Sequence, residues 1–524
     1  MRRIANDSGA RTSVWMDVEV PSFDTPVVSG SHTEVCVIGA GIAGVSIAHE
    51  LVRRGADVIV VDDGPIAGGE TARTSAHVSN ALDDRFHWLE SRHGTEAARI
   101  AAQSHAAAID LIEDNAAMIG LDCEFARIDG WLVPASDRDH GELERELAAA
   151  IRCGVAVEKL DSPFPFHRGA ALRFRDQARF QPVAYVRGLA AAIIAQGGQI
   201  HCGLHVDAIE PGRPLGVRLR GGGVIWAKHV VDATNATITS MVRFPIRQAP
   251  YRTYVIAIEI APGSTLDALL WDTADPYHYV RLAGDRLIVG GEDHRTGHGS
   301  DPSYHWNALE EWTRQRYPET GEVVARWSGQ CMEPADGLAF IGKNPDLEGV
   351  YVVTGDSGNG LTHATIGSMI IPALIEGRDH PYAALYDPGR STLRSVSTIV
   401  REALSSNYPY LDWIGRGDVT DPVDIARGEG AVIRRGVHLI AAYRDPHGVL
   451  HECSARCPHL SGVVSWNAAE KTWDCPCHGS RFDPLGRVLN PPAVSDLPAA
   501  PAHDEKPQPT EPRTPTERRP RHVR

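Results

Sequence analysis

Apolar and polar positions follow two different patterns along this chain of 524 residues. Residues 34–390 alternate short apolar runs, typical of buried strands, with alanine-rich stretches typical of helices, such as residues 101–119. This alternation predicts an α/β architecture. Residues 426–498 instead carry short β-like runs, such as residues 438–443, separated by turn sequences. That second pattern predicts a small all-β domain.

Three further segments fit neither pattern. Residues 1–33 are expected to form an extended N-terminal arm. Residues 391–425 have mixed polarity and are expected to form a connector with one helix followed by a loop. Residues 499–524 are rich in proline and charge and have almost no apolar side chains, so we expect a disordered tail.

Composition limits the classes of function. The net charge is -15, which gives no reason to expect nucleic acid or an anionic membrane as a partner. No apolar run is long enough to span a membrane, and no apolar stretch follows the two N-terminal arginines as it would in a secretory signal. We therefore expect a soluble, cytoplasmic protein.

A glycine motif near the start indicates a nucleotide site. A strand-like run leads into Gly39, Gly41 and Gly44, a helix-like stretch follows, and a second strand-like run ends in Asp62. These glycines allow a tight turn, a close approach to a pyrophosphate and close packing of the helix, whose N-terminus faces the phosphate charge. An acid at the end of the second strand can bind ribose hydroxyls, a role that the neighbouring Asp63 could also fill.

Further segments decide which dinucleotide is expected. The motif and these segments occur together, and in the same order, in the D-amino-acid-oxidase/glycine-oxidase-like FAD oxidoreductases, which this chain resembles. The matching segments are residues 68–77, 179–206, 230–235, 327–342 and 351–362. The resemblance implies a Rossmann-like FAD-binding domain of the glutathione-reductase type at residues 34–390, with an antiparallel β substrate domain at about residues 245–325.

The resemblance also implies FAD-binding positions. They are Gly39, Ala40, Gly41, Ile42, Ala43, Gly44, Asp62, Asp63, Gly69, Thr71, Ala72, Arg73, Thr74, Ser75, Ala76, Val206, Ala233, Thr234, Asn235, Asp336, Gly355, Gly358, Asn359, Gly360, Leu361 and Thr362. Some relatives attach the flavin through a histidine or a cysteine, but Arg73 stands at the histidine position and Cys331 has the wrong offset. We therefore expect non-covalent FAD and a buried, apolar Cys331. Because no second glycine motif occurs, a bound nicotinamide cofactor is not expected.

Candidate catalytic residues are less sharply defined. His77 follows the second glycine loop and is a candidate base or substrate-orienting group, with structural packing as the alternative. The expected substrate sheet carries further candidates for substrate contact, each of which could equally be an ordinary core or surface residue: Tyr251, Tyr254, Tyr277, His278, Tyr279 and Arg281.

A second motif indicates an iron–sulfur centre. Cys457 and His459 form one pair, and Cys475 and His478 form another after an intervening segment. A zinc site is the alternative, but zinc fingers usually separate the cysteine pair from the histidine pair, whereas each pair here mixes the two. The segment resembles Rieske proteins, which implies a [2Fe–2S] cluster with two cysteine and two histidine ligands.

The Rieske-like segment departs from the high-potential type. That type links its two cluster loops by a disulfide, but Gly462 stands where the partner of Cys477 would be, so no bridge is expected. Ser480 keeps a hydroxyl donor near the sulfurs, and Phe482 replaces a tyrosine donor. Because such donors stabilise the reduced cluster, we expect a reduction potential below that of the respiratory type.

The two motifs together predict a redox enzyme. The resemblance implies an FAD enzyme that removes hydride from an amine or amino-acid-like substrate and passes single electrons through the cluster to an external carrier. Two alternatives remain open: a reductase running in the opposite direction, and a non-catalytic redox sensor. A Rieske oxygenase is not expected, because no helix carries the two histidines and the carboxylate of a mononuclear iron site.

Overall fold

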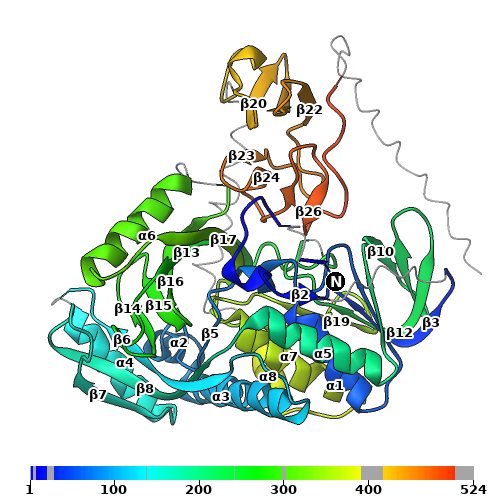
Figure 1. Ribbon diagram of the computed structural model, residues 1–524. Coiled ribbons are helices and arrows are strands. Elements are labelled where there is room, and N and C mark those ends of the chain that lie inside the picture. Colours follow the sequence, from blue (N-terminus) through cyan, green and yellow to red (C-terminus); the bar gives the residue numbers. More distant parts are fainter. Residues whose placement is uncertain are drawn as a thin grey trace, which may run out of the picture.

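The computed structural model describes residues 2–3, 8–20, 29–136, 139–240, 242–297, 302–390 and 417–501. A large body with two sheets carries a small β module on one side, drawn in orange to red in Figure 1. Most of the predicted connector (residues 391–416) and of the predicted tail (residues 502–524) lie outside the described residues, so both stay predictions.

The first sheet of the body is mainly parallel and has eight strands. In sheet order these are β10 (Val206–Glu210), β11 (Leu215–Leu219), β12 (Val224–Asp232), β3 (His32–Ile38), β4 (Val58–Asp62) and β9 (Gln199–Cys202), with β19 (Val350–Thr354) paired to β12 and β18 (Phe340–Lys343) to β19. The last four residues of β3 and the first four of β4 are consecutive apolar, buried positions, as expected of parallel strands that are covered on both faces.

Three helices cover this sheet. They are α1 (Ile42–Arg53), α5 (Pro182–Ala195) and α7 (Gly360–Ile375), and α1 packs against both of the others (Figure 1). Helix α5 begins at a proline, and the Gln181 side chain accepts a hydrogen bond from Ala184 N, which satisfies one of the first backbone donors. These packed helices fix the loops that precede them.

The second sheet has nine strands. In order they are β17 (Val323–Pro334), β13 (Gln248–Glu259), β16 (Arg286–Arg295), β15 (His278–Ala283), β14 (Leu269–Asp272), β6 (Ala126–Val133), β8 (Ala170–Arg179) and β5 (His77–Val78), with β7 (Val157–Asp161) paired to β8. All pairs are antiparallel except β14 with β6. The sheet predicted over residues 245–325 is therefore only part of it, because strands β5 to β8 complete it from an earlier part of the chain.

The remaining helices surround the second sheet and the junction between the sheets. They are α2 (Phe86–His93), α3 (Thr95–Met118), α4 (His140–Arg152), α6 (Pro302–Arg316), α8 (Ala383–Tyr386) and the short 3-10 helices η1 (Val14–Met16) and η2 (Glu70–Arg73), whereas the 3-10 helix η6 (Pro422–Asp424) belongs to the β module. Helix α3 starts earlier than the predicted residues 101–119, because the chain enters it through Gly94, whose φ of 88° makes the sharp turn from α2.

The β module consists of two small antiparallel sheets. One contains β20 (Glu429–Arg435), β21 (His438–Arg444) and β22 (Leu450–Ser454), and the other contains β23 (Ser465–Asn467), β24 (Thr472–Asp474), β25 (Arg481–Phe482) and β26 (Val488–Asn490). Bridges from Gly417 and Val419 to Ile433, and from Ala499 to Cys453, extend its pairing beyond the predicted residues 426–498. Within the module, the sheet of β23 to β26 lies nearer to the body than the sheet of β20 to β22 (Figure 1).

The N-terminal segment is more structured than an extended arm. Besides η1 it contains two short paired strands, β1 (Arg2–Arg3) and β2 (Glu19–Val20). Trp15 is buried, and its Nε1 donates to Thr74 O at 2.6 Å. Ala10 N donates to Glu470 O at 2.7 Å. The segment therefore packs against both the body and the β module.

Candidate functional site

A cavity of about 680 Å³ lies between the two sheets of the body. The loop after β3, the ends of β4 and β12 and the N-terminus of α7 line one end, and strands β13, β15, β16 and β17 line the other. Residues 488–491 of the β module also line it. The cavity thus lies at the carboxyl ends of parallel strands, where α/β sheets bind their ligands.

The glycine loop is shaped for a close ligand. Gly39 has a φ of 107°, and a Cβ there would lie 2.5 Å from Ala233 O, so a side chain does not fit. Gly41 lines the cavity and precedes α1, where Ile42 N donates to Thr71 Oγ1 at 3.0 Å and the N-cap residue Gly41 offers no side-chain acceptor to the N–H groups that follow. Uncapped backbone N–H groups at a helix N-terminus favour an anion, so the residues present fit a pyrophosphate.

The two acids after β4 have different surroundings. Asp62 accepts hydrogen bonds from Ala40 N at 2.5 Å and from Gly64 N at 2.7 Å, and it lines the cavity. Asp63 instead pairs with His205 Nδ1 at 2.8 Å. Asp62 is therefore the better placed candidate for the ribose.

Replacement of Gly44 by alanine is expected to abolish FAD binding. A Cβ on this residue would lie 1.9 Å from Gly39 O, so helix α1 would have to move away from the loop. The flavin absorbance per mole of purified protein measures the loss. Gly141→Ala in α4 is the matched control, because its nearest neighbouring atom is 3.7 Å away. Full flavin content in Gly44→Ala would contradict the assigned role of this loop.

The predicted FAD positions divide into two groups. Those that line the cavity are Gly39, Gly41, Ile42, Ala43, Asp62, Asp63, Gly69, Thr71, Thr74, Ser75, Val206, Ala233, Thr234, Asn235, Gly358, Asn359, Gly360 and Leu361. Those that lie behind its wall are Ala40, Gly44, Ala72, Arg73, Ala76, Asp336, Gly355 and Thr362.

Three residues of the second group point their side chains elsewhere. Arg73 belongs to the short helix η2, and its side chain points away from the cavity, where Nη1 donates to Ser328 O at 3.0 Å. Asp336 forms an ion pair with Arg390 at 2.8 Å, and Thr362 Oγ1 bonds His105 Nδ1 at 2.7 Å. Their side chains therefore contribute to the scaffold, and a contact of these three residues with the cofactor stays a prediction.

His77 lines the cavity, but both of its ring nitrogens have partners. Nε2 lies 3.2 Å from Val280 O, which can only accept, and Nδ1 lies 3.0 Å from Ser75 Oγ. Burial and the nearby Arg281 lower the pKa of His77 to about 3. The ring is therefore a neutral imidazole with Nε2 protonated, an arrangement that favours a positioning role over that of a base.

The other candidates for substrate contact on the second sheet also fall into two groups. Tyr251, Tyr277, Tyr279 and Cys331 line the cavity, so Cys331 is not the enclosed apolar cysteine that the sequence suggested. The remaining candidates have structural contacts: Tyr254 stacks on His305, His278 bonds Asp272, and Arg281 donates to Ala76 O and Phe180 O.

Sequence reasoning missed a group of carboxylates in the cavity wall. They are Asp83, Asp84, Asp293, Glu333 and Asp356. Burial raises the pKa of Asp293 to about 7 and that of Asp84 and Asp356 to about 6, and it raises the pKa of Glu333 strongly. These residues come from separate strands and loops, so no local motif could have revealed them.

The four Rieske-like ligands meet at the tip of the β module. The Cys457 and Cys475 side chains contact each other, and the rings of His459 and His478 lie with centroids 4.9 Å apart. The buried Nδ1 of His478 has no hydrogen-bond partner among the described residues, and burial lowers the pKa of this residue to about 3. A neutral imidazole with an open ring nitrogen fits an iron ligand.

The spacing of these side chains distinguishes the two kinds of metal centre. Within the described ranges, no group of three or more histidine, cysteine, aspartate or glutamate side chains surrounds a single point. A structural zinc site would need four ligands around one ion. In a Rieske centre each of the two irons takes only two protein ligands, so this arrangement fits [2Fe–2S].

All nine cysteines lie in the described ranges, and none of them is paired in a disulfide. A Cβ on Gly462 would lie 2.5 Å from Cys477 Sγ. Gly462→Cys is therefore expected to form the missing bridge, closing a loop of about 15 residues and stabilising the β module by about 3 kcal/mol. Non-reducing peptide mapping and urea unfolding with and without reductant measure this. Equal unfolding midpoints under both conditions would contradict the expected bridge.

The cluster loops contact the wall of the cavity. Gln330 Nε2 donates to Gly479 O at 3.0 Å, next to the ligand His478, and Gln330 N donates to Glu70 Oε2 at 2.7 Å. Both Gln330 and Glu70 line the cavity. A Cβ on Gly479 would lie 2.7 Å from the Pro250 side chain, so the loop lies directly on strand β13.

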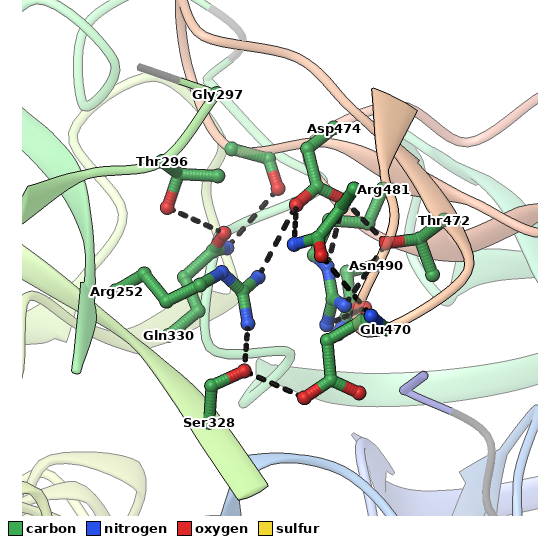
Figure 2. A network of polar contacts seen from close by, with 12 residues as sticks. Arg252, Thr296, Gly297, Ser328, Gln330, Glu470, Thr472, Asp474, Arg481 and Asn490 are labelled. Atoms are coloured by element: carbon green, nitrogen blue, oxygen red, sulfur yellow. Dashed lines mark hydrogen bonds and ion pairs between the residues drawn. The ribbon is translucent and has the colours of Figure 1, made fainter. Parts of the chain in front are cut away.

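A buried polar network joins the β module to the body (Figure 2). Ser328 Oγ donates to Glu470 Oε1 at 2.6 Å and accepts from Arg252 Nη1 at 2.8 Å. Arg252 also lies 3.6 Å from Asp474, and Arg481 Nε donates to Asp474 Oδ1 at 3.1 Å. Side chains of the body and of the module therefore alternate in one network.

Charge in this network is balanced. Arg73 pairs with Glu470 at 3.4 Å, and Arg481 lies 3.9 Å from Glu70, so three guanidinium groups face three carboxylates. Burial raises the pKa of Glu470, but the neighbouring arginines outweigh this and hold it below its usual value. Because unpaired buried charges are costly, the network favours one fixed position of the module.

The fold and the two sites define a flavoprotein oxidoreductase that carries an iron–sulfur domain. Residues 34–372 match the family of FAD dependent oxidoreductases, and residues 417–501 match the Rieske [2Fe-2S] domain. The chain belongs to the FAD dependent oxidoreductase family and ends in a Rieske domain. The predicted fold class and the two cofactors, FAD and a [2Fe–2S] cluster, are thereby confirmed.

Two relatives and two solved structures illustrate the similarity. YhfW of Bacillus subtilis, named as a Rieske 2Fe-2S iron-sulfur protein, is 28% identical over 494 residues, which cover 91% of this chain and 95% of YhfW. The Gamma-glutamylputrescine oxidoreductase of Escherichia coli is 25% identical over 406 residues, 71% of this chain and 92% of the relative. Glycine oxidase from Geobacillus kaustophilus has a TM-score of 0.61 at 19% identity, covering 69% of this chain and 99% of that one. L-proline dehydrogenase from P. horikoshii has a TM-score of 0.59 at 20% identity, and the match covers 68% of this chain and 97% of that one.

These structural likenesses show the shared fold of the body. Among the helices in the described ranges, none combines the length and the apolar character that a membrane span requires.

Proposed function

We propose that this protein is a dehydrogenase of an amine or amino-acid-like small molecule. Bound FAD supplies a hydride acceptor, and the [2Fe–2S] cluster supplies a one-electron route to an external carrier. The family, and the amine named for the Escherichia coli relative, support this substrate class. We place the reaction in the cytoplasm.

The main support for this proposal comes from the contacts of Gln330. Gln330 forms part of the cavity wall with its backbone and holds the loop of the cluster ligand His478 with its side chain. A single residue therefore separates the cavity from the cluster loop. This proximity favours a dehydrogenase over an oxidase, because it gives the electrons a route out of the flavin site that does not need oxygen.

The residues of the chain prepare the cavity for this chemistry. The uncapped N-terminus of α7 points its first backbone N–H groups at the cavity, where they favour negative charge. Asn490 and Pro491 of the β module also form part of the wall. Tyr251, Tyr277 and Tyr279 offer the aromatic surface against which a small substrate packs.

Anaerobic absorbance of the purified holoenzyme tests the proposal, with a panel of secondary amines and N-methyl amino acids. We expect the flavin bands to bleach with one of these compounds and the Rieske bands then to fade. If no compound bleaches the flavin but a reduced ferredoxin reduces the cluster first, electrons run in the opposite direction and the proposed substrate class is wrong.

A further inference from the structure

The wall of the cavity is strongly acidic. None of the described residues that line it is an arginine or a lysine. Its carboxylates are Asp62, Asp63, Glu70, Asp83, Asp84, Asp275, Asp293, Glu333 and Asp356. The first two lie at the nucleotide end, and the pyrophosphate of FAD would add further negative charge there. The charge of the wall is therefore left for the substrate to balance.

Two of these carboxylates compete for one hydrogen atom. Ser357 Oγ lies 2.9 Å from Asp84 Oδ2 and 2.9 Å from Glu333 Oε2. A serine hydroxyl has one hydrogen to donate, so it can satisfy only one of the two acids at a time. The two carboxylates therefore share this hydroxyl donor, and Glu333 also has a hydrogen bond with the Cys331 thiol.

Asp293 gives an independent indication of a missing ligand. It projects from β16 into the cavity, and its Oδ1 is buried without any hydrogen-bond partner among the described residues. Its other known contact is with the hydroxyl of Thr253. A buried acceptor of this kind is costly unless a ligand supplies the donor.

Aromatic rings complete the surroundings of Asp293. Tyr277 and Tyr279 line the same end of the cavity with ring centroids 5.5 Å apart, and Tyr277 Oη donates to Asp83 Oδ2 at 2.8 Å. Carboxylates beside tyrosine faces form the kind of site that binds an alkylammonium group through charge and cation–π contacts.

We propose that the substrate is a linear diamine or polyamine that carries no carboxylate. This inference rests on the proposed function and specifies its substrate class. The reacting nitrogen would bind unprotonated, and bound FAD would supply the acceptor for a hydride from the carbon next to it, so that the substrate would become an iminium ion. A second, protonated nitrogen is held by Asp293 together with the Tyr277 and Tyr279 rings. An α-amino acid would bring a carboxylate against this acidic wall without a basic partner.

Matched series of substrates test the proposal. The probes are α,ω-diaminoalkanes of increasing length, the ω-amino acids of the same lengths, and the 1-aminoalkanes. The rate of anaerobic flavin bleaching in the holoenzyme is measured for each. We expect diamines to be preferred over ω-amino acids of the same length by about tenfold or more. Asp293→Asn is expected to reduce this preference, whereas Asp267→Asn, which removes an exposed partner of Arg179, is expected to keep it.

The outcomes separate this inference from the proposed function. If ω-amino acids or α-amino acids bleach the flavin faster than every diamine, the diamine proposal is wrong while the dehydrogenase stands. If no amine of any kind bleaches it, the proposed function itself fails. If Asp293→Asn prefers diamines as strongly as the unchanged protein, Asp293 is not the recognition group.

Diamine binding is expected to depend on pH. Burial raises the pKa of Asp293 to about 7, so its carboxyl is partly protonated at neutral pH in the ligand-free protein. An ammonium group binds the ionised form, so affinity should rise as the pH increases through about 7, and binding should release a proton. The groups that face this carboxyl are Asp83, Glu292, Tyr277, Tyr279 and Cys331.

Calorimetric titration of the holoenzyme with a diaminoalkane, in buffers of different ionisation enthalpy, measures the proton release. The release should be smaller in Asp293→Asn. A binding constant that is the same on both sides of pH 7 would contradict the assigned role of this carboxyl.

Discussion

Replacement of Cys475 by alanine is expected to abolish turnover with one-electron acceptors while leaving the flavin reaction intact. Cys475 is almost fully buried, and its side chain contacts that of the second cysteine ligand, Cys457. Loss of this ligand removes the cluster, whereas the FAD cavity is lined mainly by the body. We expect iron to be absent, FAD to be retained, and the substrate to bleach the flavin anaerobically without onward electron transfer.

Cys453→Ala is the matched control for this experiment. Cys453 belongs to the same β module, and its thiol donates only to Leu485 O, at 3.4 Å. This variant should keep iron, FAD and turnover. Turnover of Cys475→Ala at the rate of the unchanged protein would show that electrons leave the flavin without the cluster.

Replacement of Glu470 by glutamine is expected to loosen the β module from the body. The change keeps the volume but removes one of three buried carboxylates, so three guanidinium groups face only two. Removal of one partner from a buried ion pair costs about 3–5 kcal/mol. We expect a lower urea midpoint, and a slower transfer from the flavin to the cluster, because electron transfer slows steeply as the distance between the centres grows.

Glu452→Gln provides the comparison. Glu452 forms an ion pair with Arg435 at 2.7 Å in the same module, but both side chains are more than a fifth exposed. An exposed pair of this kind contributes about 0–1 kcal/mol. FAD and iron content establish that both variants fold. If Glu470→Gln transfers electrons as fast as Glu452→Gln, the network does not set the position of the module.

The sequence revealed those parts of the sites whose residues are neighbours along the chain. Gly39 and Gly41 lie in the turn between β3 and α1, and Gly44 lies in the first turn of α1. The spacing of Cys457, His459, Cys475 and His478 follows from two loops of one small domain. In both cases the backbone alone brings the residues together, so their order already predicts the ligand.

Residues whose role depends on side-chain direction were harder to predict. Arg73 lies between the cavity-lining Thr71 and Thr74, but the short helix η2 turns its side chain toward Glu470. Asp336 belongs to a segment that resembles the family's cofactor site, yet Arg390 neutralises it outside the cavity. Neither pairing has a signal in the local sequence, because each partner lies far away along the chain.

The acidic wall and the interface between the two parts were not predictable for the same reason. Asp293 and Glu333 reach the cavity from different strands of the second sheet, and that sheet includes strands from residues 77–179 that the sequence did not assign to it. Arg252 and Asp474 meet only after both parts have folded. Tertiary structure, rather than any periodicity, creates these contacts.

We expect electrons to pass from the flavin to the cluster within one molecule. Rapid-freeze EPR of the holoenzyme after anaerobic mixing with a reducing amine measures this step directly, at several protein concentrations. We expect the signal of the reduced cluster to appear as the flavin is reoxidised, with a rate constant that is independent of protein concentration. A rate proportional to protein concentration, or a signal that appears only after an external carrier is added, would contradict it.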